Sequence, residues 1–399
     1  MPISQKKIII FTGLVKISRN LVGTAVIYPE MARGLNQAGF KVSMVGPEAV
    51  EMKQPGVDYY VYHKKNNEKL IRGSSAVIFG SYPPIEPMEY ARKNGKNIIT
   101  YMWSIAPIGS LEFRDFKSFK RQDELHRFIV DSYNKSLKYS DKIFCRDERA
   151  REVIVGSLIT LGRVDLAGYR IGHNFDSLVQ IAPFGLSWGR PRHNKNIYRG
   201  VAHGIKQDDF IMLWNGGVWN RTDAPGMVKI MKHIWPKNRK IKLVFQGFYN
   251  PHGINTSEAK EAWRLLKKFE LLNKNIFIPD KWIEFDERDG YLAEADAGIT
   301  LSPNIPDANY FIKTRFYDYL WAELPIILNR CESFTSEVEK YGLGLVLAGD
   351  YKRQAWEIVK FVGNKKLQTE IRSNIREYKQ GKSWDKQLKP VVEYCQKVN

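Results

Sequence analysis

At 399 residues the chain exceeds what one hydrophobic core usually serves, since cores stop growing at roughly 250–300 residues, so two domains of similar size are expected. The composition is that of a globular protein, and three widely spaced cysteines argue for a reducing compartment and against a disulfide framework and a zinc site. The net charge of +19 predicts attraction to anionic partners, but scattered basic residues do not select among nucleic acid, membrane and phosphate-bearing substrates.

In the first half of the chain, short apolar runs alternate with amphipathic stretches of helical length, the pattern of parallel α/β units. The apolar run Lys7–Phe11 predicts a strand buried on both faces. A loop with Gly13 and Gly23 follows it, and a helix is predicted from Pro29 to Ala38. Further strands are predicted at Lys41–Val45, Ala76–Phe79, Asn97–Met102 and Lys142–Cys145.

The pattern lapses in residues 187–209, which are polar and basic, and we interpret them as an interdomain linker. The alternation then restarts. Strands are predicted at Phe210–Trp214, Lys242–Gln246, Ile276–Ile278, Ala297–Thr300 and Ile326–Leu328. Helices are predicted at Ala224–Trp235, Ser257–Phe269, Phe285–Ala295 and Phe316–Ala322. Two such arrays predict an α/β protein with two doubly wound, Rossmann-like domains facing a cleft, with ligands beyond the carboxyl ends of the strands.

The segment from Asp307 to residue 327 carries the strongest chemical signal. Lys313 and Arg315 precede a predicted helix, whose positive N-terminal end attracts a diphosphate. Asp318 falls in the first turn, where a carboxylate can accept hydrogen bonds from a ribose. The alternative is that Asp318 only complements the helix dipole and that the cations decorate a loop.

A second segment follows the predicted strand at 210–214. Gly216 and Gly217 would let the backbone approach a phosphate, and Arg221 could supply a fork of donors. A tight turn without a ligand is the alternative. Trp103 and Trp282 could stack on bases or sugars, although most tryptophans are packing residues.

Several segments together resemble the retaining glycosyltransferases of family 4, specifically a bacterial and phage-associated branch. Residues 313–325, KTRFYDYLWAELP, are similar to the branch's helix start R-T-R-x-x-D-Y-L-W-A-G-x-P. Residues 216–225, GGVWNRTDAP, are similar to its GGIWxWxDP-like turn. Weaker similarities lie at 282–296, 156–164 and 183–185, and the matches run in order from residue 7 to about residue 348.

The resemblance implies the GT-B fold, with the donor held mainly by the second of two Rossmann-like domains. It implies an N-terminal domain of residues 1–190, a linker of 187–209 and a donor domain of 210–383. The stretch Trp384–Lys397 would be the last helix, which returns residues 384–399 to the first domain. It also implies retention at the anomeric carbon, a nucleotide-diphosphate sugar as donor, and neither an obligate metal nor a cofactor.

The resemblance also implies roles for single residues. Asp318 would hold the donor ribose, and Asp307 would lie near the sugar. Arg221, with Lys313 or Arg315, would neutralise the leaving diphosphate, which gains negative charge in the transition state. The remaining donor-binding residues would be Thr314, Gly216, Gly217, Trp282, Ile283 and Gly23.

The chain also departs from the branch. Arg221 stands where the branch has tryptophan, Glu323 where it has glycine, and Ile27 where it has arginine. Two aspartates of the acceptor-side loop are absent, and Trp103 and Glu112 are the acceptor contacts that we predict there. Acceptor identity therefore does not carry over from the family.

Three functions fit these features. The first is a cytoplasmic transferase acting on a glycan or lipid-linked glycan, with basic charge holding it to the inner face of an anionic membrane. The second is a transferase acting on modified bases of DNA, where the same charge would bind phosphates. The third is a non-catalytic or pseudo-glycosyltransferase. We favour the first because the sequence contains no recognisable base-flipping wedge or groove-reading element. The oligomeric state is not indicated.

Overall fold

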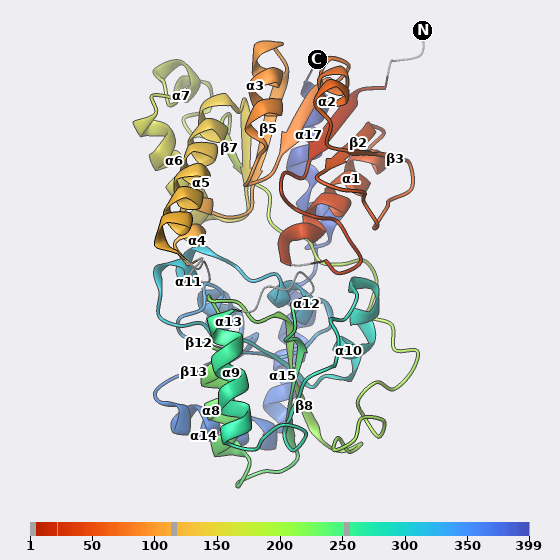
Figure 1. The fold of residues 1–399 in the computed structure, drawn as a ribbon, viewed down its shortest axis with the longest axis vertical. Coiled ribbons are helices and arrows are strands. Elements are labelled where there is room, and N and C mark those ends of the chain that lie inside the picture. Colours follow the sequence, from red (N-terminus) through yellow and green to blue (C-terminus); the bar gives the residue numbers. More distant parts are fainter. Residues whose placement is uncertain (1–4, 22, 113–117, 251–255, 399) are drawn as a thin grey trace. The chain divides into compact units, whose positions relative to one another are not determined.

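The computed structural model describes residues 5–21, 23–112, 118–250 and 256–398 (Figure 1). The chain divides into two compact units. The first takes its described residues from 1–111, 116–185 and 384–399, and the second from 112–115 and 186–383. Each unit is built on one parallel sheet with helices, so the predicted fold class of two Rossmann-like α/β domains is confirmed.

The sheet of the first unit contains seven strands in the described part of the chain, in the order β3-β2-β1-β4-β5-β6-β7. Its interior strand β1 pairs in parallel with β2 and β4, and Ile8 to Phe11 are buried, as a strand covered on both faces requires. The strands are β1 (Lys7–Phe11), β2 (Lys41–Gly46), β3 (Val57–Val61), β4 (Ala76–Phe79), β5 (Asn97–Met102), β6 (Lys142–Cys145) and β7 (Val179–Ile181).

Three helices of this unit begin at a residue whose side chain caps them. Ser118, Asp147 and Asp165 each accept a hydrogen bond from a first-turn N–H, and they start α5, α6 and α7. The helical segments are η1 (Gly23–Val26), α1 (Ile27–Gln37), α2 (Lys64–Arg72), α3 (Ile85–Lys93), α4 (Ala106–Ser110), α5 (Phe119–Tyr139), α6 (Glu148–Thr160) and α7 (Leu166–Gly172).

The C-terminal stretch forms two helices, α16 (Trp384–Gln387) and α17 (Lys389–Lys397), rather than one. Pro390 lies in the first turn of α17, where its missing N–H is tolerated, whereas a continuous helix would need that N–H. Trp384 is buried, and a Cβ on Gly185 would lie 2.4 Å from the Trp384 Cα. The absence of a side chain at Gly185 therefore lets α16 pack onto the first unit.

The sheet of the second unit has the order β10-β9-β8-β11-β12-β13, six strands among the residues that the structure describes. Its strands are β8 (Phe210–Gly217), β9 (Ile241–Gly247), β10 (Ile276–Phe277), β11 (Ala297–Ile299), β12 (Ile326–Asn329) and β13 (Gly344–Leu347). Its helical segments are α8 (Ala224–Ile234), α9 (Ser257–Lys268), η2 (Phe285–Glu287), α10 (Arg288–Glu294), α11 (Pro306–Tyr310), α12 (Arg315–Trp321), α13 (Thr335–Tyr341), α14 (Tyr351–Gly363) and α15 (Lys365–Tyr378).

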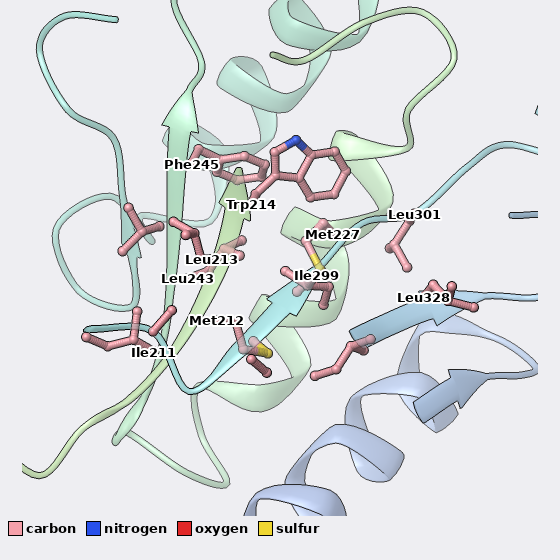
Figure 2. Close-up of a cluster of buried hydrophobic side chains, with 14 of the residues drawn as sticks. Ile211, Met212, Leu213, Trp214, Met227, Leu243, Phe245, Ile299, Leu301 and Leu328 are labelled. Atoms are coloured by element: carbon pink, nitrogen blue, oxygen red, sulfur yellow. The ribbon is translucent and has the colours of Figure 1, made fainter. Parts of the chain in front are cut away.

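One face of this sheet packs against α8. Figure 2 shows the rings of Trp214 and Phe245 against each other at the ends of β8 and β9, with Met227 of α8 in the same cluster. The two ring centroids are 5.2 Å apart. Because successive side chains of a strand point to opposite faces, Leu213 belongs to the other face. The strand is irregular after Trp214, and Asn215 reaches that other face through its hydrogen bond to Asp318 of α12.

The other face is covered by α12. The Tyr319 hydroxyl donates to the Leu213 carbonyl at 2.8 Å. Gly298 of β11 pairs with Leu213, and a Cβ on Gly298 would lie 2.2 Å from the Tyr319 ring. A glycine at this point lets α12 lie directly on the sheet, which fixes the side chains at the start of α12.

Residues 187–209, the predicted linker, group with the second unit. The buried Glu294 carboxylate accepts hydrogen bonds from the N–H groups of Tyr198 and Arg199 at 2.8 and 2.9 Å. The Arg199 guanidinium lies 2.6 Å from Asp296. These bonds tie the stretch to α10 and to the start of β11, even though its sequence has no helical or strand period.

Candidate functional site

The predicted donor-site residues of the second unit gather at the carboxyl ends of β8, β11 and β12. Arg221 follows β8, and Lys313 and Arg315 lie at the start of α12. The charges of Arg315 and Arg221 both act on Lys313. These three residues form what we call the cationic cluster, which the sequence predicted from two separate segments.

Lys313 is buried and already has partners. Its ammonium donates to Ser302 and to Glu332 Oε1, the latter at 2.5 Å. Ser302 Oγ in turn donates to the Arg221 carbonyl at 3.2 Å. Burial lowers the pKa of Lys313, against the opposing effect of Glu332. Lys313 therefore holds the loop that carries Arg221.

Arg221 and Asp307, which the sequence placed near the diphosphate and the sugar, lie together. Arg221 Nη1 is 3.4 Å from Asp307 Oδ2, and the guanidinium lies 4.3 Å from the centre of the Phe311 ring. Asp307 is buried, whereas the Arg221 side chain keeps 15% of its surface exposed. The ring and the carboxylate orient the guanidinium, as fixed donors for an anion require.

Arg315 is buried, and in the described part of the chain it forms no ion pair with a carboxylate. Its Nη2 donates to the Gly217 carbonyl at 2.6 Å and would lie 3.8 Å from a Cβ on Gly216, whose φ is +80°. Its Nη1 is buried and has no hydrogen-bond partner among the described residues. Burying an unpartnered charged donor is costly, so this position is suited to an anion.

Asp318 faces two residues that sequence reasoning did not assign to the site. Asn215 Nδ2 donates to Asp318 Oδ2 at 2.7 Å, and Arg288 Nε lies 3.4 Å from Oδ1. Burial raises the pKa of Asp318, and Arg288 and Asn215 oppose that rise. The side chain is 23% exposed, and its oxygens keep lone pairs for further donors.

Arg288 is positioned by aromatic rings and a hydroxyl. Its guanidinium lies 3.6 Å from the centre of the Phe285 ring and 4.9 Å from that of Trp321, and Nη2 donates to Ser187 Oγ at 2.8 Å. Arg288 precedes Asp318 by 30 residues. No local sequence pattern predicts this pairing.

The other predicted donor residues lie around the same strand ends. A Cβ on Gly247 would be 2.8 Å from Trp282 Cζ3, so the indole lies against the end of β9, while Ile283 is buried. Thr314 occupies the N-cap position of α12, but its side chain accepts no hydrogen bond from the first turn of the helix. The N–H groups of Phe316 and Tyr317 donate to the carbonyls of residues 313 and 314, so side chains rather than these amides are available to a ligand.

Three other residues predicted for the site come from other segments of the chain. Gly23, with φ +53°, begins η1 in the first unit. Trp103 is buried in that unit, with its ring 5.4 Å from that of Tyr82, so its face is not open to a sugar in this structure. Glu112 is buried and groups with the second unit, and its carbonyl accepts from Asn220 Nδ2 at 3.2 Å.

The described residues contain no candidate membrane span and no candidate metal cluster. Among them, no helix is long and apolar enough to cross a membrane. Within the same residues, no group of three or more His, Cys, Asp and Glu side chains could hold a metal ion.

No protein-family model matches the sequence, and no curated protein matches it either. Solved structures do match it over nearly its whole length. HepE from Anabaena, in complex with UDP and glucose, is 9% identical with a TM-score of 0.69, and the match covers 98% of this chain and 100% of HepE. Sucrose-phosphate synthase from Thermosynechococcus elongatus is 14% identical with a TM-score of 0.66, over 98% and 99% of the two chains. WaaG, a glycosyltransferase involved in lipopolysaccharide biosynthesis, is 11% identical with a TM-score of 0.64, over 98% and 100%.

At these identities the similarity establishes the fold. The chain has the GT-B fold of glycosyltransferases, as the sequence resemblance implied.

Proposed function

We propose that this protein is a retaining glycosyltransferase that moves a sugar from a nucleotide-diphosphate donor to a glycan or lipid-linked acceptor. The observation that carries the proposal is Arg315, a buried guanidinium with an unsatisfied donor at the carboxyl end of β8. A diphosphate over Gly216 and Gly217 would supply the missing acceptor.

The neighbouring residues suit the other parts of such a donor. The ribose hydroxyls would donate to Asp318, whose orientation Asn215 and Arg288 fix. Asp307, beside Arg221, would lie near the sugar. As the glycosidic bond breaks, the departing diphosphate gains negative charge, and prealigned cations stabilise that charge without reorganising. Arg315 and Arg221 would do this, with Lys313 holding the Arg221 loop in place.

The comparisons support a nucleotide sugar as the donor. HepE was solved with UDP and glucose, and a trehalose-6-phosphate enzyme from E. coli with a fluorinated UDP-glucose. Both proteins match this chain with a TM-score above 0.6. The site also contains polar groups for each part of such a molecule, which makes the same ligand class reasonable here.

For the acceptor we propose a glycan carried on an anionic membrane face. The net charge of +19 would hold the protein there, because juxtamembrane basic residues contribute about 1 kcal/mol each near such a surface. The similarity to WaaG, whose role is in lipopolysaccharide synthesis, is in keeping with this acceptor class.

The test is turnover of a panel of nucleotide sugars, measured as released nucleoside diphosphate. We expect slow hydrolysis of one or two donors, faster release with a membrane glycolipid extract, and a product with the donor's anomeric configuration by NMR. Acceleration by duplex DNA instead would support the DNA-modifying alternative. No release from any donor, with glycolipid or DNA present, would contradict an enzymatic role and favour a non-catalytic protein.

A further inference from the structure

Gln246 of β9 is a buried polar side chain without a partner. Only 4% of the residue is exposed, and its amide makes no hydrogen bond with any described residue. Buried amides normally find partners. Gln368 of α15, for example, is 8% exposed and donates from Nε2 to the carbonyls of Phe361 and Val362 at 2.9 and 3.0 Å.

Gln246 belongs to β9, which pairs with β8, the strand that carries Asn215 of the proposed ribose site. Trp214 of β8 pairs with Phe245 of β9, and their rings share the α8 face. Gln246 therefore belongs to the opposite face of β9. The β8–β9 register shifts between Trp214 and Gly217, so Asn215 is assigned to that same face by its hydrogen bond to Asp318 of α12 and not by pairing with Gln246. Asn215 is the residue that hydrogen-bonds Asp318.

The residue after Gln246 reaches a second part of the site. A Cβ on Gly247 would lie 2.6 Å from the Gly216 carbonyl carbon and 2.8 Å from Trp282 Cζ3. The end of β9 thus lies between the Gly216–Gly217 turn and the Trp282 indole. An unpaired amide at this point is next to where a nucleoside would extend from a diphosphate held by Arg315.

We propose that Gln246 binds the nucleoside of the donor, through hydrogen bonds from its amide to a ribose hydroxyl or to the polar edge of the base. This inference rests on the proposed function. An amide offers one acceptor oxygen and two N–H donors and carries no charge. It therefore suits the hydroxyl, carbonyl and N–H groups of a nucleoside and contributes little to binding of a bare pyrophosphate.

The substitution Gln246→Met keeps the length of the side chain and removes its polar atoms. Binding of UDP, GDP, ADP and inorganic pyrophosphate is measured by calorimetry, and Tm is measured without ligand. Because one net hydrogen bond is lost, we expect the variant to bind the preferred nucleotide about two- to tenfold more weakly and pyrophosphate unchanged. Because an unsatisfied buried group is removed, we expect the ligand-free Tm to rise by about 2–4 °C.

Gln368→Met is the matched control, since it makes the same change in a buried glutamine whose amide has partners. It should lower Tm and leave nucleotide affinity unchanged. Gln246→Met with wild-type nucleotide affinity, or with equal losses for nucleotide and pyrophosphate, overturns the inference while the proposed function stands. A wild-type protein that binds no nucleoside diphosphate overturns both.

Discussion

At the residue scale, the surroundings of Asp318 disfavour the ionised form of its carboxyl group. Burial raises its pKa, and the contacts from Arg288 and Asn215 do not fully offset the rise. A carboxyl whose pKa is higher in the folded than in the unfolded state lowers stability when ionised, and this cost disappears as pH falls through the folded-state pKa. A carboxyl group whose pKa is raised by burial beside specific polar partners is typical of a ligand-binding site.

We predict that Asp318→Asn weakens nucleotide-sugar binding at pH 7 by about tenfold or more, because hydrogen bonds to a charged group are worth roughly 1.5–3 kcal/mol. The free energy of unfolding at pH 7 should be unchanged or higher. Wild-type affinity should fall as the solution is acidified, beginning at a higher pH than for an ordinary aspartate, and the variant should lack this dependence. Calorimetric titrations at several pH values check both points, and equal pH profiles for the two proteins would contradict the role.

Glu323 is a residue with left-handed backbone that contacts from neighbouring basic residues hold in place. It stands where the branch that the sequence resembles has glycine, and its φ is +57°, a region that glycine enters freely and other residues rarely. The Glu323 carboxylate lies 2.7 Å from Lys379 Nζ and 3.3 Å from Arg376 Nη1, and its carbonyl accepts from Arg372 at 2.8 Å. These contacts from α15 and from Lys379, which follows it, offset the strain, so a glutamate at this position is compatible with an intact α12.

At the element scale, the site depends on how closely α12 lies on the sheet. Gly298 permits this closeness, since a Cβ there would be 2.2 Å from the Tyr319 ring. We predict that Gly298→Ala displaces α12, and with it Arg315 and Asp318. It should therefore lower stability by about 1–3 kcal/mol and also weaken nucleotide binding.

The control is Gly156→Ala in α6, where an added Cβ meets nothing within 4 Å. This change should be neutral or stabilising, because alanine favours a helix interior over glycine by roughly 1 kcal/mol. Thermal unfolding and nucleotide titration of both variants check the pair. Nucleotide binding by Gly298→Ala at the wild-type level would show that the site does not depend on this contact.

The strands that could be predicted from the sequence are those with continuous apolar runs. The alternation of apolar and amphipathic stretches did not predict β3, β7 and β13, which all lie at sheet edges. An edge strand buries less of its surface, so its sequence carries less of the apolar signal; β3, for instance, has two exposed residues out of five.

The site could be predicted only in part. The KTRFYDYLW segment predicted the start of α12, whereas Asn215 and Arg288 contact Asp318 from positions 103 and 30 residues away in the sequence. Only the folded sheet brings those contacts together.

At the scale of the whole molecule, the net charge of +19 predicts attraction to anionic surfaces. We expect the protein to sediment with vesicles containing anionic lipid and not with neutral vesicles. Binding should weaken as salt rises from about 0.1 M to about 1 M, because the screening length falls from about 10 Å to about 3 Å. Salt-sensitive binding to duplex DNA without vesicle binding would instead favour the DNA acceptor.

The central claim is that the unsatisfied guanidinium of Arg315 binds a nucleoside diphosphate. Calorimetric titration of UDP and GDP into the wild type and into Arg315→Met tests it most directly. The control is Arg353→Met, which removes an arginine that is 66% exposed on α14 of the same unit. We predict that the wild type and the control bind one of the nucleotides equally and that Arg315→Met binds it roughly tenfold to a hundredfold more weakly. Equal affinity for all three proteins, or no binding to the wild type, would contradict the account.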